Sequence, residues 1–223
     1  MTPPTLPADH PPKVLVIVAH PAMAHSRINR ALVRSAMSLV AQGDGPAIEV
    51  RDLYRLYPDY LIDIDAEQAA LAQATLVVWQ HPIHWYHMPP LMKLWVDEVL
   101  AFGWAYGAAG SALQGKDLWL VASTGGPQES YRPDSYNRYF FDAFLPPYEQ
   151  TAALCGMRFL PPMLLHGAHR VGRDDVAEHA ATFAQRLASY PDWPEIAELE
   201  ECLACDIPSD ARPAVEEPID KAA

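Results

Sequence analysis

Residues 14–19 read Val-Leu-Val-Ile-Val-Ala, an unbroken apolar and mostly β-branched run that ends at His20-Pro21. Such a run without alternating polar residues is typical of a parallel strand that is covered on both faces. Ser26, a favourable N-cap residue, then precedes apolar residues at helical spacing up to Gly43. The stretch therefore predicts a buried strand followed by a loop and a helix.

The same alternation continues along the chain. Further strands are predicted at residues 48–53, 75–80, 118–123 and 159–165. Helices are predicted at residues 66–72, from Pro89-Pro90 onward, at 139–154 and at 174–190. Strands that alternate with helices at this spacing form a parallel sheet, and right-handed crossovers place the helices on both of its faces. We therefore predict an α/β fold with a doubly wound, five-stranded parallel sheet.

Length and charge bound the domain organisation and the kind of ligand. With 223 residues, half of them hydrophobic, the chain can bury one sizeable core. We expect a flexible, proline-rich leader at residues 1–12, one domain at 13–190, and an acidic, largely disordered tail at 191–223. The tail holds ten acidic and two basic residues, and the whole chain has a net charge of -12. This balance argues against nucleic acid and anionic membrane surfaces as partners, so a small molecule is the expected ligand.

Targeting and metal-binding signals are weak. The sequence has no run of about 20 apolar residues, and its start lacks the basic and apolar regions of a secretory signal, so we expect a cytoplasmic protein without membrane insertion. Cys155 lies in an apolar stretch, and Cys202 and Cys205 form a C-x-x-C motif without a second pair. Neither a disulfide framework nor a zinc site is indicated, and redox pairing of Cys202 with Cys205 is a minor alternative.

Three loops follow strands at the end of the sheet where ligands bind in doubly wound folds. The first, residues 20–29, offers Ser26 and backbone amides at a helix N-terminus, which favour an anion; the alternative is that Ser26 only caps the helix. The second, residues 82–86, presents Trp85 and Tyr86, which suit a planar ligand or else pack in a subunit interface. The third, residues 123–127, contains Gly125-Gly126, which permits close backbone approach, although such a pair alone is most often a turn.

Together the three loops suit the head of a flavin mononucleotide. The residues also resemble those of a known family, the NAD(P)H:quinone oxidoreductases with a flavodoxin-like fold. Within it they are most similar to the bacterial ancillary subunits of glutathione-gated potassium efflux systems. The resemblance covers about residues 13–190 and rests on five motifs, which are residues 13–21 (KVLVIVAHP), 79–86 (WQHPIHWY), 89–95 (PPLMKLW), 103–107 (GWAYG) and 124–126 (TGG).

The resemblance implies a flavodoxin-like fold that binds FMN, with FAD as the alternative flavin, and uses NAD(P)H as co-substrate. The implied reaction is two-electron hydride transfer from NAD(P)H through the flavin to a quinone. The implied flavin-binding residues are His20, Ser26, Arg27, Ile28, Asn29, Pro82, Ile83, His84, Trp85, Tyr86, Thr124, Gly125 and Gly126. No metal is implied, because the proline-bounded turn that carries His81, His84 and His87 makes their convergence on an ion improbable.

The resemblance also implies catalytic roles for Tyr131 and Asn137. In the animal quinone reductases of the family a tyrosine and a histidine assist charge transfer; Tyr131 matches the tyrosine, whereas Asn137 stands near the place of the histidine. Asparagine donates a hydrogen bond but carries no proton at neutral pH, so Asn137→Ala is expected to change quinone turnover only modestly. A hundredfold loss in steady-state rate would contradict this. His166 and His169 are expected to be satisfied edge residues.

Two other functions remain open at this point. The chain could be chiefly a regulatory subunit that docks on the cytoplasmic domain of a potassium efflux antiporter, which would bring it to the inner membrane. Alternatively it is an azo or nitro reductase, which uses the same flavin chemistry with another acceptor. The resemblance further implies a homodimer, with Trp104 and Tyr106 as candidates for the interface.

Overall fold

The computed structural model describes residues 13–42 and 45–199 of the chain. The predicted leader at residues 1–12 lies outside the described residues. So does the predicted tail from residue 200 onward, with Cys202 and Cys205. None of the helices within the described residues is both long enough and apolar enough to span a bilayer.

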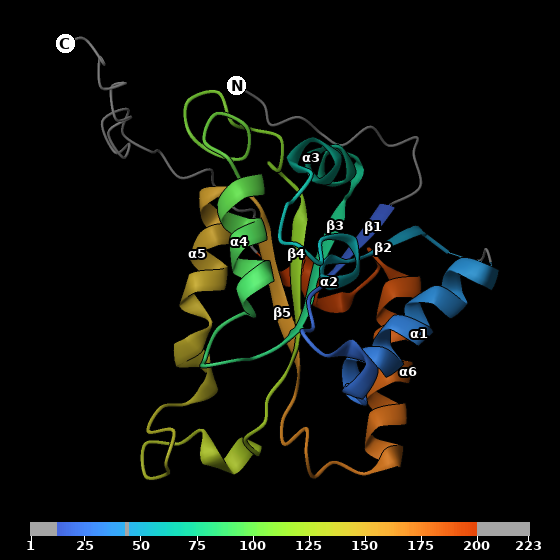
Figure 1. Ribbon diagram of the computed structural model, residues 1–223, viewed down its shortest axis with the longest axis vertical. Coiled ribbons are helices and arrows are strands. Elements are labelled where there is room, and N and C mark those ends of the chain that lie inside the picture. The colour runs from blue at the N-terminus through green and yellow to red at the C-terminus, as the bar shows by residue number, and fades with distance from the viewer. Residues whose placement is uncertain (1–12, 43–44, 200–223) are drawn as a thin grey trace.

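The strands form one parallel sheet in the order β2-β1-β3-β4-β5, which confirms the predicted doubly wound topology (Figure 1). Their bounds are β1 Lys13–Val18, β2 Ala47–Asp52, β3 Leu76–Pro82, β4 Asp117–Ser123 and β5 Arg158–Leu165. Because the strands are parallel, their carboxyl ends meet at one edge of the sheet, at the lower end of the view in Figure 1. We call it the carboxyl edge. Strand order reverses between β1 and β3, so ligand binding is expected there.

Helices cover both faces of the sheet. One face carries α1 (Ile28–Gln42) and α6 (Arg173–Ser189), and the other carries α3 (Ile64–Gln73), α4 (Pro90–Val99) and α5 (Pro146–Leu154) (Figure 1). The packing of β1 explains why its sequence is apolar from Val14 onward. Leu15 and Ile17 belong to the core under α4, whereas Val14, Val16 and Val18 belong to the core under α1 and α6. Successive side chains of a strand point to opposite faces, so a strand with two covered faces needs apolar residues throughout.

Two predicted elements differ from the structure. The prediction of one helix over residues 139–154 is wrong: a 3₁₀ turn spans Phe141–Phe144, and α5 begins only at Pro146. Pro146 and Pro147 have no N–H to donate, so they fit the first turn of a helix and not its interior. Leu53, predicted as the end of the second strand, instead begins the short helix α2 (Leu53–Leu56).

The segment that follows α6 packs against the domain. Trp193 is 5% exposed, and its ring centroid lies 4.8 Å from that of Trp119 on β4. Arg186 of α6 lies over the Trp193 ring and donates two hydrogen bonds, of 2.8 and 2.6 Å, to the Glu195 carboxylate. A short 3₁₀ helix follows at Pro194–Glu198. The described part of the predicted tail, residues 191–199, therefore packs on the α6 side of the domain.

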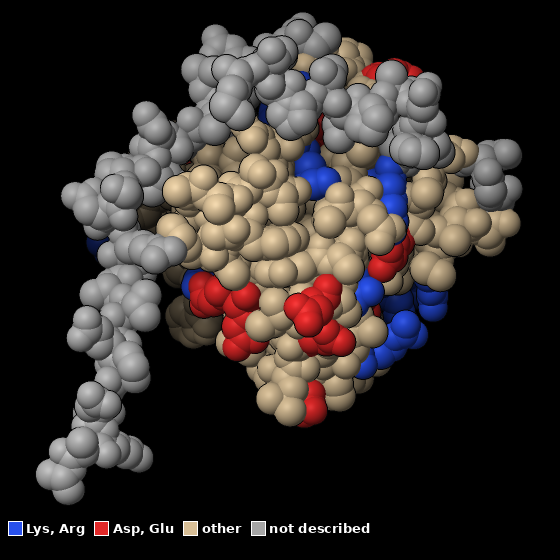
Figure 2. All heavy atoms as spheres, turned by 90° about the horizontal axis from the view of Figure 1, so that it is seen from above, with Lys and Arg blue, Asp and Glu red and all other residues tan. Residues whose placement is uncertain are grey.

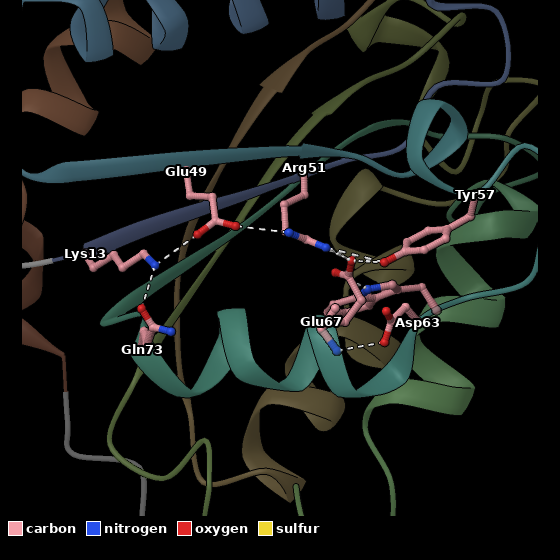
Figure 3. Close-up of polar contacts among 9 residues, drawn as sticks. Lys13, Glu49, Arg51, Tyr57, Asp63, Glu67 and Gln73 are labelled. Carbon is pink, nitrogen blue, oxygen red and sulfur yellow. Dashed lines mark hydrogen bonds and ion pairs between the residues drawn. The ribbon is translucent and has the colours of Figure 1, made fainter.

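A buried carboxylate links four elements on the other face of the sheet (Figure 3). Glu67 of α3 is fully buried and accepts hydrogen bonds from the Arg51 guanidinium at 2.5 Å, the Tyr57 hydroxyl at 2.5 Å and the Trp95 indole at 2.9 Å. Burial alone lowers the pKa of Arg51, but its hydrogen bonds to Glu67, Tyr57 and Glu49 raise it overall. Burial, and then Glu67, raises the pKa of Tyr57 to about 12. The network joins β2, the end of α2, α3 and α4.

Candidate functional site

A cleft of about 690 Å³ opens at the carboxyl edge between the loops that follow β1, β3, β4 and β5. This volume is typical of small-molecule and cofactor sites. Its walls are formed by His20, His25, Ser26, Arg27, Ile28, Asn29, Pro82, Ile83, His84, Trp85, Ser123, Thr124, Gly125, Ala168 and His169. Eleven of the thirteen residues predicted to bind flavin are among them; Tyr86 and Gly126 adjoin the cleft in sequence but do not line it.

The first wall is the loop between β1 and α1. The Ser26 hydroxyl accepts a hydrogen bond from the backbone N–H of Asn29 at 3.1 Å. Ser26 therefore caps the helix, which is the alternative to its binding an anion. The backbone N–H groups of Arg27 and Ile28 have no acceptor within the described residues. They stand at the N-terminus of a fifteen-residue helix, where free amides and the helix dipole favour a negative charge.

His20 in the same loop is oriented by the backbone. Its Nδ1 accepts the N–H of Ala22 at 3.0 Å, which assigns the ring proton to Nε2. Burial, and then the neighbouring His84, lowers the pKa of His20, so the ring is neutral at pH 7. The ring centroids of His20 and His84 are 6.5 Å apart. His20 therefore contributes a hydrogen-bond donor to the cleft without a charge.

The second wall is a tight turn after β3. His84 and His87 exchange two backbone hydrogen bonds, of 2.8 and 3.0 Å, and the central residues Trp85 and Tyr86 have φ of 49° and 66°. Positive φ at both central residues is the pattern of a type I′ turn, which normally holds Asn and Gly. Trp85 is 92% exposed, whereas the Tyr86 ring stacks on Phe144 at 5.1 Å. A large apolar side chain is thus presented to solvent at the mouth of the cleft.

The third wall is the glycine loop after β4. The N–H groups of Gly125 and Gly126 have no protein acceptor in the part of the chain that the structure describes. An added Cβ at Gly125 would meet only His169, at 3.5 Å, which is ordinary contact. An added Cβ at Gly126 would lie 2.7 Å from the Ser130 hydroxyl and 2.9 Å from the Tyr136 hydroxyl. Of these two residues, therefore, only Gly126 is a glycine that the neighbouring protein atoms require.

This difference gives a paired prediction. Gly126→Ala is expected to lower the free energy of unfolding by about 1–3 kcal/mol, because the methyl group overlaps side chains of its own loop. Gly125→Ala is expected to leave stability within about 0.5 kcal/mol and to narrow the cleft instead. Chemical denaturation of both variants measures the effect. Equal losses of stability would contradict this assignment of the two glycines.

The fourth wall, the loop after β5, is absent from the sequence prediction. The N–H of Gly167 donates to the carbonyl of Gly126, and the N–H of Ala168 donates to that of Thr124, both at 2.8 Å. These bonds fasten the loop to the glycine loop and bring Ala168 and His169 into the cleft. The only signal in the sequence is topological, since the carboxyl ends of all parallel strands share one edge. His25 and Ser123 are the other two lining residues that the prediction omits.

The predicted catalytic residues lie behind the glycine loop and do not line the cleft. Tyr131 is 7% exposed and packs edge-to-face on Phe141 at 5.2 Å. Burial raises the pKa of Tyr131, and the adjacent Thr124 hydroxyl lowers it in part. Asn137 is 8% exposed, and its side-chain amide donates to the Ser130 hydroxyl at 2.9 Å. Asn137 therefore braces the loop.

The cleft is positive in an acidic protein. Its lining contains Arg27 and four histidines but no carboxylate, although the chain carries a net charge of -12. The Arg27 guanidinium donates to the carbonyl of Val171 at 2.9 Å, which holds it at the cleft between α1 and α6. A cleft without carboxylates in a protein of net negative charge favours an anionic ligand at that cleft.

A buried histidine at the end of β3 lies next to the second wall. His81 of β3 is fully buried, stacks on the Tyr148 ring at 5.7 Å and lies 3.0 Å from the carbonyl of Pro82, to which Nδ1–H donates. Burial lowers the pKa of His81 to about 4. The folded protein therefore holds His81 neutral over a pH range in which the unfolded chain protonates it.

This histidine makes stability depend on pH. The unfolded state binds the proton more readily, so His81 destabilises the fold as pH falls from 6.5 towards 4, by about 3 kcal/mol at the lower limit. Urea unfolding at pH 7 and pH 4.5 measures the loss. His81→Asn retains a donor for Pro82 but does not titrate, so its stability should fall less over the same interval. Parallel losses in the two proteins would contradict the prediction.

Three comparisons with known proteins agree with this architecture. A family model described as flavodoxin-like fold matches residues 12–190. The glutathione-regulated potassium-efflux system ancillary protein KefF of Citrobacter koseri is 43% identical over 177 residues, which is 79% of this chain and 96% of the relative. Two crystal structures also superimpose on this chain. General stress protein 14 of Treponema denticola in complex with FMN has a TM-score of 0.72 and 35% identity, covering 78% of this chain and 97% of its own.

The second crystal structure is a proposed quinone reductase from Klebsiella pneumoniae. It has a TM-score of 0.68 and 28% identity, covering 78% of this chain and 83% of its own. The matched region of the family model contains the whole sheet, helices α1 to α6 and every residue that lines the cleft. The chain therefore belongs to the flavodoxin-like fold family.

Proposed function

We propose that the protein binds FMN in this cleft and is an NAD(P)H:quinone oxidoreductase. The observation that carries the proposal is the pairing of two sets of free backbone donors in one carboxylate-free cleft. Arg27 and Ile28 offer N–H groups at a helix N-terminus, and Gly125 offers an N–H group on the glycine loop, next in sequence to the unbonded N–H of Gly126. The first set suits a phosphate and the second suits the electron-rich edge of a reduced ring.

The other lining residues fit the same ligand. Trp85 has the exposed aromatic face that a planar ring needs, and His20 supplies an uncharged Nε2–H donor. The chemistry that a bound flavin supplies is two-electron hydride transfer from NAD(P)H to an acceptor. This chain would contribute position and electrostatics, with the N–H groups of Gly125 and Gly126 stabilising negative charge. Tyr131 would act on the cleft from behind Thr124, and Asn137 only through the loop that it braces.

Two relatives support the choice of cofactor and reaction. The Treponema denticola protein was crystallised with FMN, and the Klebsiella pneumoniae protein is described as a proposed quinone reductase. FAD is the alternative flavin, and an azo or nitro compound is the alternative acceptor.

The proposal is tested by flavin titration and steady-state kinetics. The purified protein is expected to bind one FMN per chain with quenching of flavin fluorescence, and then to oxidise NADH or NADPH when a quinone is present. Mass analysis of the chromophore released from the protein as isolated separates FMN from FAD. A colourless protein that takes up neither flavin would overturn the proposal.

A second function is favoured by the likeness to KefF. We propose that the chain also serves as an ancillary subunit of a potassium efflux transporter, because its relative of 43% identity is named for that role. It would then act in the cytoplasm, at the inner membrane through its partner. Co-purification with such a transporter supports docking. Quinone turnover without any binding to the transporter would leave only the enzyme.

The proposed dimer gives the segment around Trp104 and Tyr106 a role. Residues 99–115 contain no charged residue, and they follow α4 at the end of the molecule opposite the cleft (Figure 1). Figure 2, seen from that end, shows a wide uncharged area between the charged groups. One chain cannot bring this segment to its own cleft, so it would meet a cleft only in a second copy. Sedimentation analysis should then show a dimer.

A further inference from the structure

One titratable group beside the cleft has no role in the proposal above. His166 follows β5 and is half-buried behind the glycine loop. Its ring lies 5.3 Å from that of Tyr131 and, edge-to-face, 5.2 Å from that of Phe141. Its Nδ1 is 2.9 Å from the hydroxyl oxygen of Thr124, a residue that lines the cleft and is 1% exposed. The His166 ring thus packs against two aromatic rings, and its Nδ1 lies within hydrogen-bond distance of Thr124 in the cleft lining.

The direction of this hydrogen bond follows from a second one. The Thr124 hydroxyl donates to the carbonyl of Gly126 at 2.7 Å, and that carbonyl can only accept. The Thr124 oxygen is then an acceptor towards His166, which assigns the ring proton to Nδ1. Burial lowers the pKa of His166, although Glu129 opposes this, so the neutral form is favoured. The hydrogen bonds therefore run from His166 Nδ1–H to the Thr124 hydroxyl, and from that hydroxyl to the carbonyl of Gly126.

This chain of hydrogen bonds acts on the backbone that faces the cleft. Backbone bonds from Gly167 and Ala168 already use the carbonyls of Gly126 and Thr124 on the β5 side. The Thr124 hydroxyl adds a bond across the loop, between residue 124 and residue 126, and His166 fixes the rotamer that makes it. Together these contacts leave the N–H groups of Gly125 and Gly126 as the free donors of the loop. Without His166, the Thr124 hydroxyl could rotate away and release the loop.

We propose that His166 is a positioning residue, which orients the Thr124 hydroxyl and thereby holds the amides of Gly125 and Gly126 in place for a ligand in the cleft. The inference deepens the proposed function and rests on it for the identity of that ligand, FMN. It gives His166 a function beyond that of the satisfied edge residue that its sequence position suggests. The imidazole acts here as a hydrogen-bond donor of fixed direction, and no proton leaves it.

The test compares a variant that keeps the donor with two that break the chain. In His166→Asn the side-chain amide can stand where Nδ1–H stands, whereas His166→Ala has no donor and Thr124→Val has no hydroxyl. His166→Ala and Thr124→Val are each expected to weaken FMN binding about tenfold, as loss of one such bond implies. The double variant should be no weaker than either single one, because both interrupt one chain. His166→Asn should restore affinity to within about threefold of the unchanged protein.

A readout without flavin keeps this test separate from the proposed function. The amide NMR signals of Gly125 and Gly126 in the flavin-free protein should shift in His166→Ala and Thr124→Val and return in His166→Asn. His179→Ala, on α6, is the matched control and should shift neither signal. Unchanged glycine signals in His166→Ala, or a His166→Asn variant as impaired as His166→Ala, would overturn the inference. If the unchanged protein binds no flavin, the proposed function fails, and the NMR result still decides the role of His166.

Discussion

Replacing Glu67 by alanine is expected to lower the free energy of unfolding by about 3–5 kcal/mol, the usual cost of removing one partner of a buried ion pair. The Glu67 carboxylate is fully buried and is the shared acceptor for Arg51, Tyr57 and Trp95 (Figure 3). Its removal leaves Glu49 as the remaining carboxylate partner of Arg51, whose side chain is only 18% exposed, and leaves a buried hydroxyl and a buried indole N–H without their acceptor. Urea unfolding followed by circular dichroism measures the loss.

A neighbouring carboxylate provides the matched control. Glu49 pairs with the same Arg51, but the Glu49 side chain is 34% exposed. Water can therefore take over its contact with Arg51 when the carboxylate is removed. Glu49→Ala is therefore expected to cost at most about 1 kcal/mol. Glu67→Gln, which keeps one acceptor oxygen but loses the charge, should fall between the two. Equal effects of Glu67→Ala and Glu49→Ala would show that burial does not set the strength of this network.

Replacing Trp85 by asparagine is expected to stabilise the fold and weaken flavin binding. Trp85 has φ of 49° in its type I′ turn, a conformation that costs a bulky residue about 1–3 kcal/mol and that asparagine adopts readily. Its side chain is 92% exposed, so little packing is lost. We expect the free energy of unfolding to rise by about 1 kcal/mol. If the indole covers the flavin ring as proposed, FMN affinity should fall about tenfold, because an aromatic contact is worth about 0.5–1.5 kcal/mol beyond its area.

A variant of the adjacent residue, Tyr86, distinguishes the effect of backbone strain from the effect of ligand binding. Tyr86 has φ of 66° in the same turn, but its ring packs on Phe144 and does not line the cleft. Tyr86→Asn should relieve comparable strain and lose the stacking contact, so stability should change little and FMN affinity should change less than in Trp85→Asn. Thermal unfolding with and without FMN reports both quantities. A Trp85→Asn variant that is less stable, or that binds FMN unchanged, would contradict this explanation of the turn.

Much of the fold follows from local patterns. β1 and β4 are largely apolar because both faces of the sheet are covered, so residues 14–19 and 118–123 are recognisable as strands without knowledge of their partners. The order of elements then determines a parallel sheet, and a parallel sheet places the loops after β1, β3 and β4 at one edge. Eleven of thirteen predicted flavin-binding residues line the cleft for that reason. The break of the predicted helix at Pro146 could also have been predicted, because proline is excluded from helix interiors.

Other features have no local signal. The Trp85-Tyr86 turn lacks the Asn-Gly signature of its type, so its left-handed backbone is imposed by the structure around it. Glu67 lies in the helical stretch Ala66-Glu67-Gln68-Ala69-Ala70 and reads as a solvated charge, whereas Arg51 and Trp95, which bury it, come from elements far away in sequence. His166 looks like an ordinary residue after an edge strand until β5 is placed beside β4.

The sequence by itself determined the order of strands and helices, the layered α/β class and the edge at which a ligand would bind, because these depend on side-chain periodicity and chain connectivity. Only the tertiary structure decided which polar groups meet across that framework. The loop after β5 closes the cleft, His166 orients Thr124, and Glu67 gathers three donors, all through contacts between residues distant in the chain. Such contacts depend on distances of a few ångströms between loops and helices, and no local sequence pattern specifies those distances.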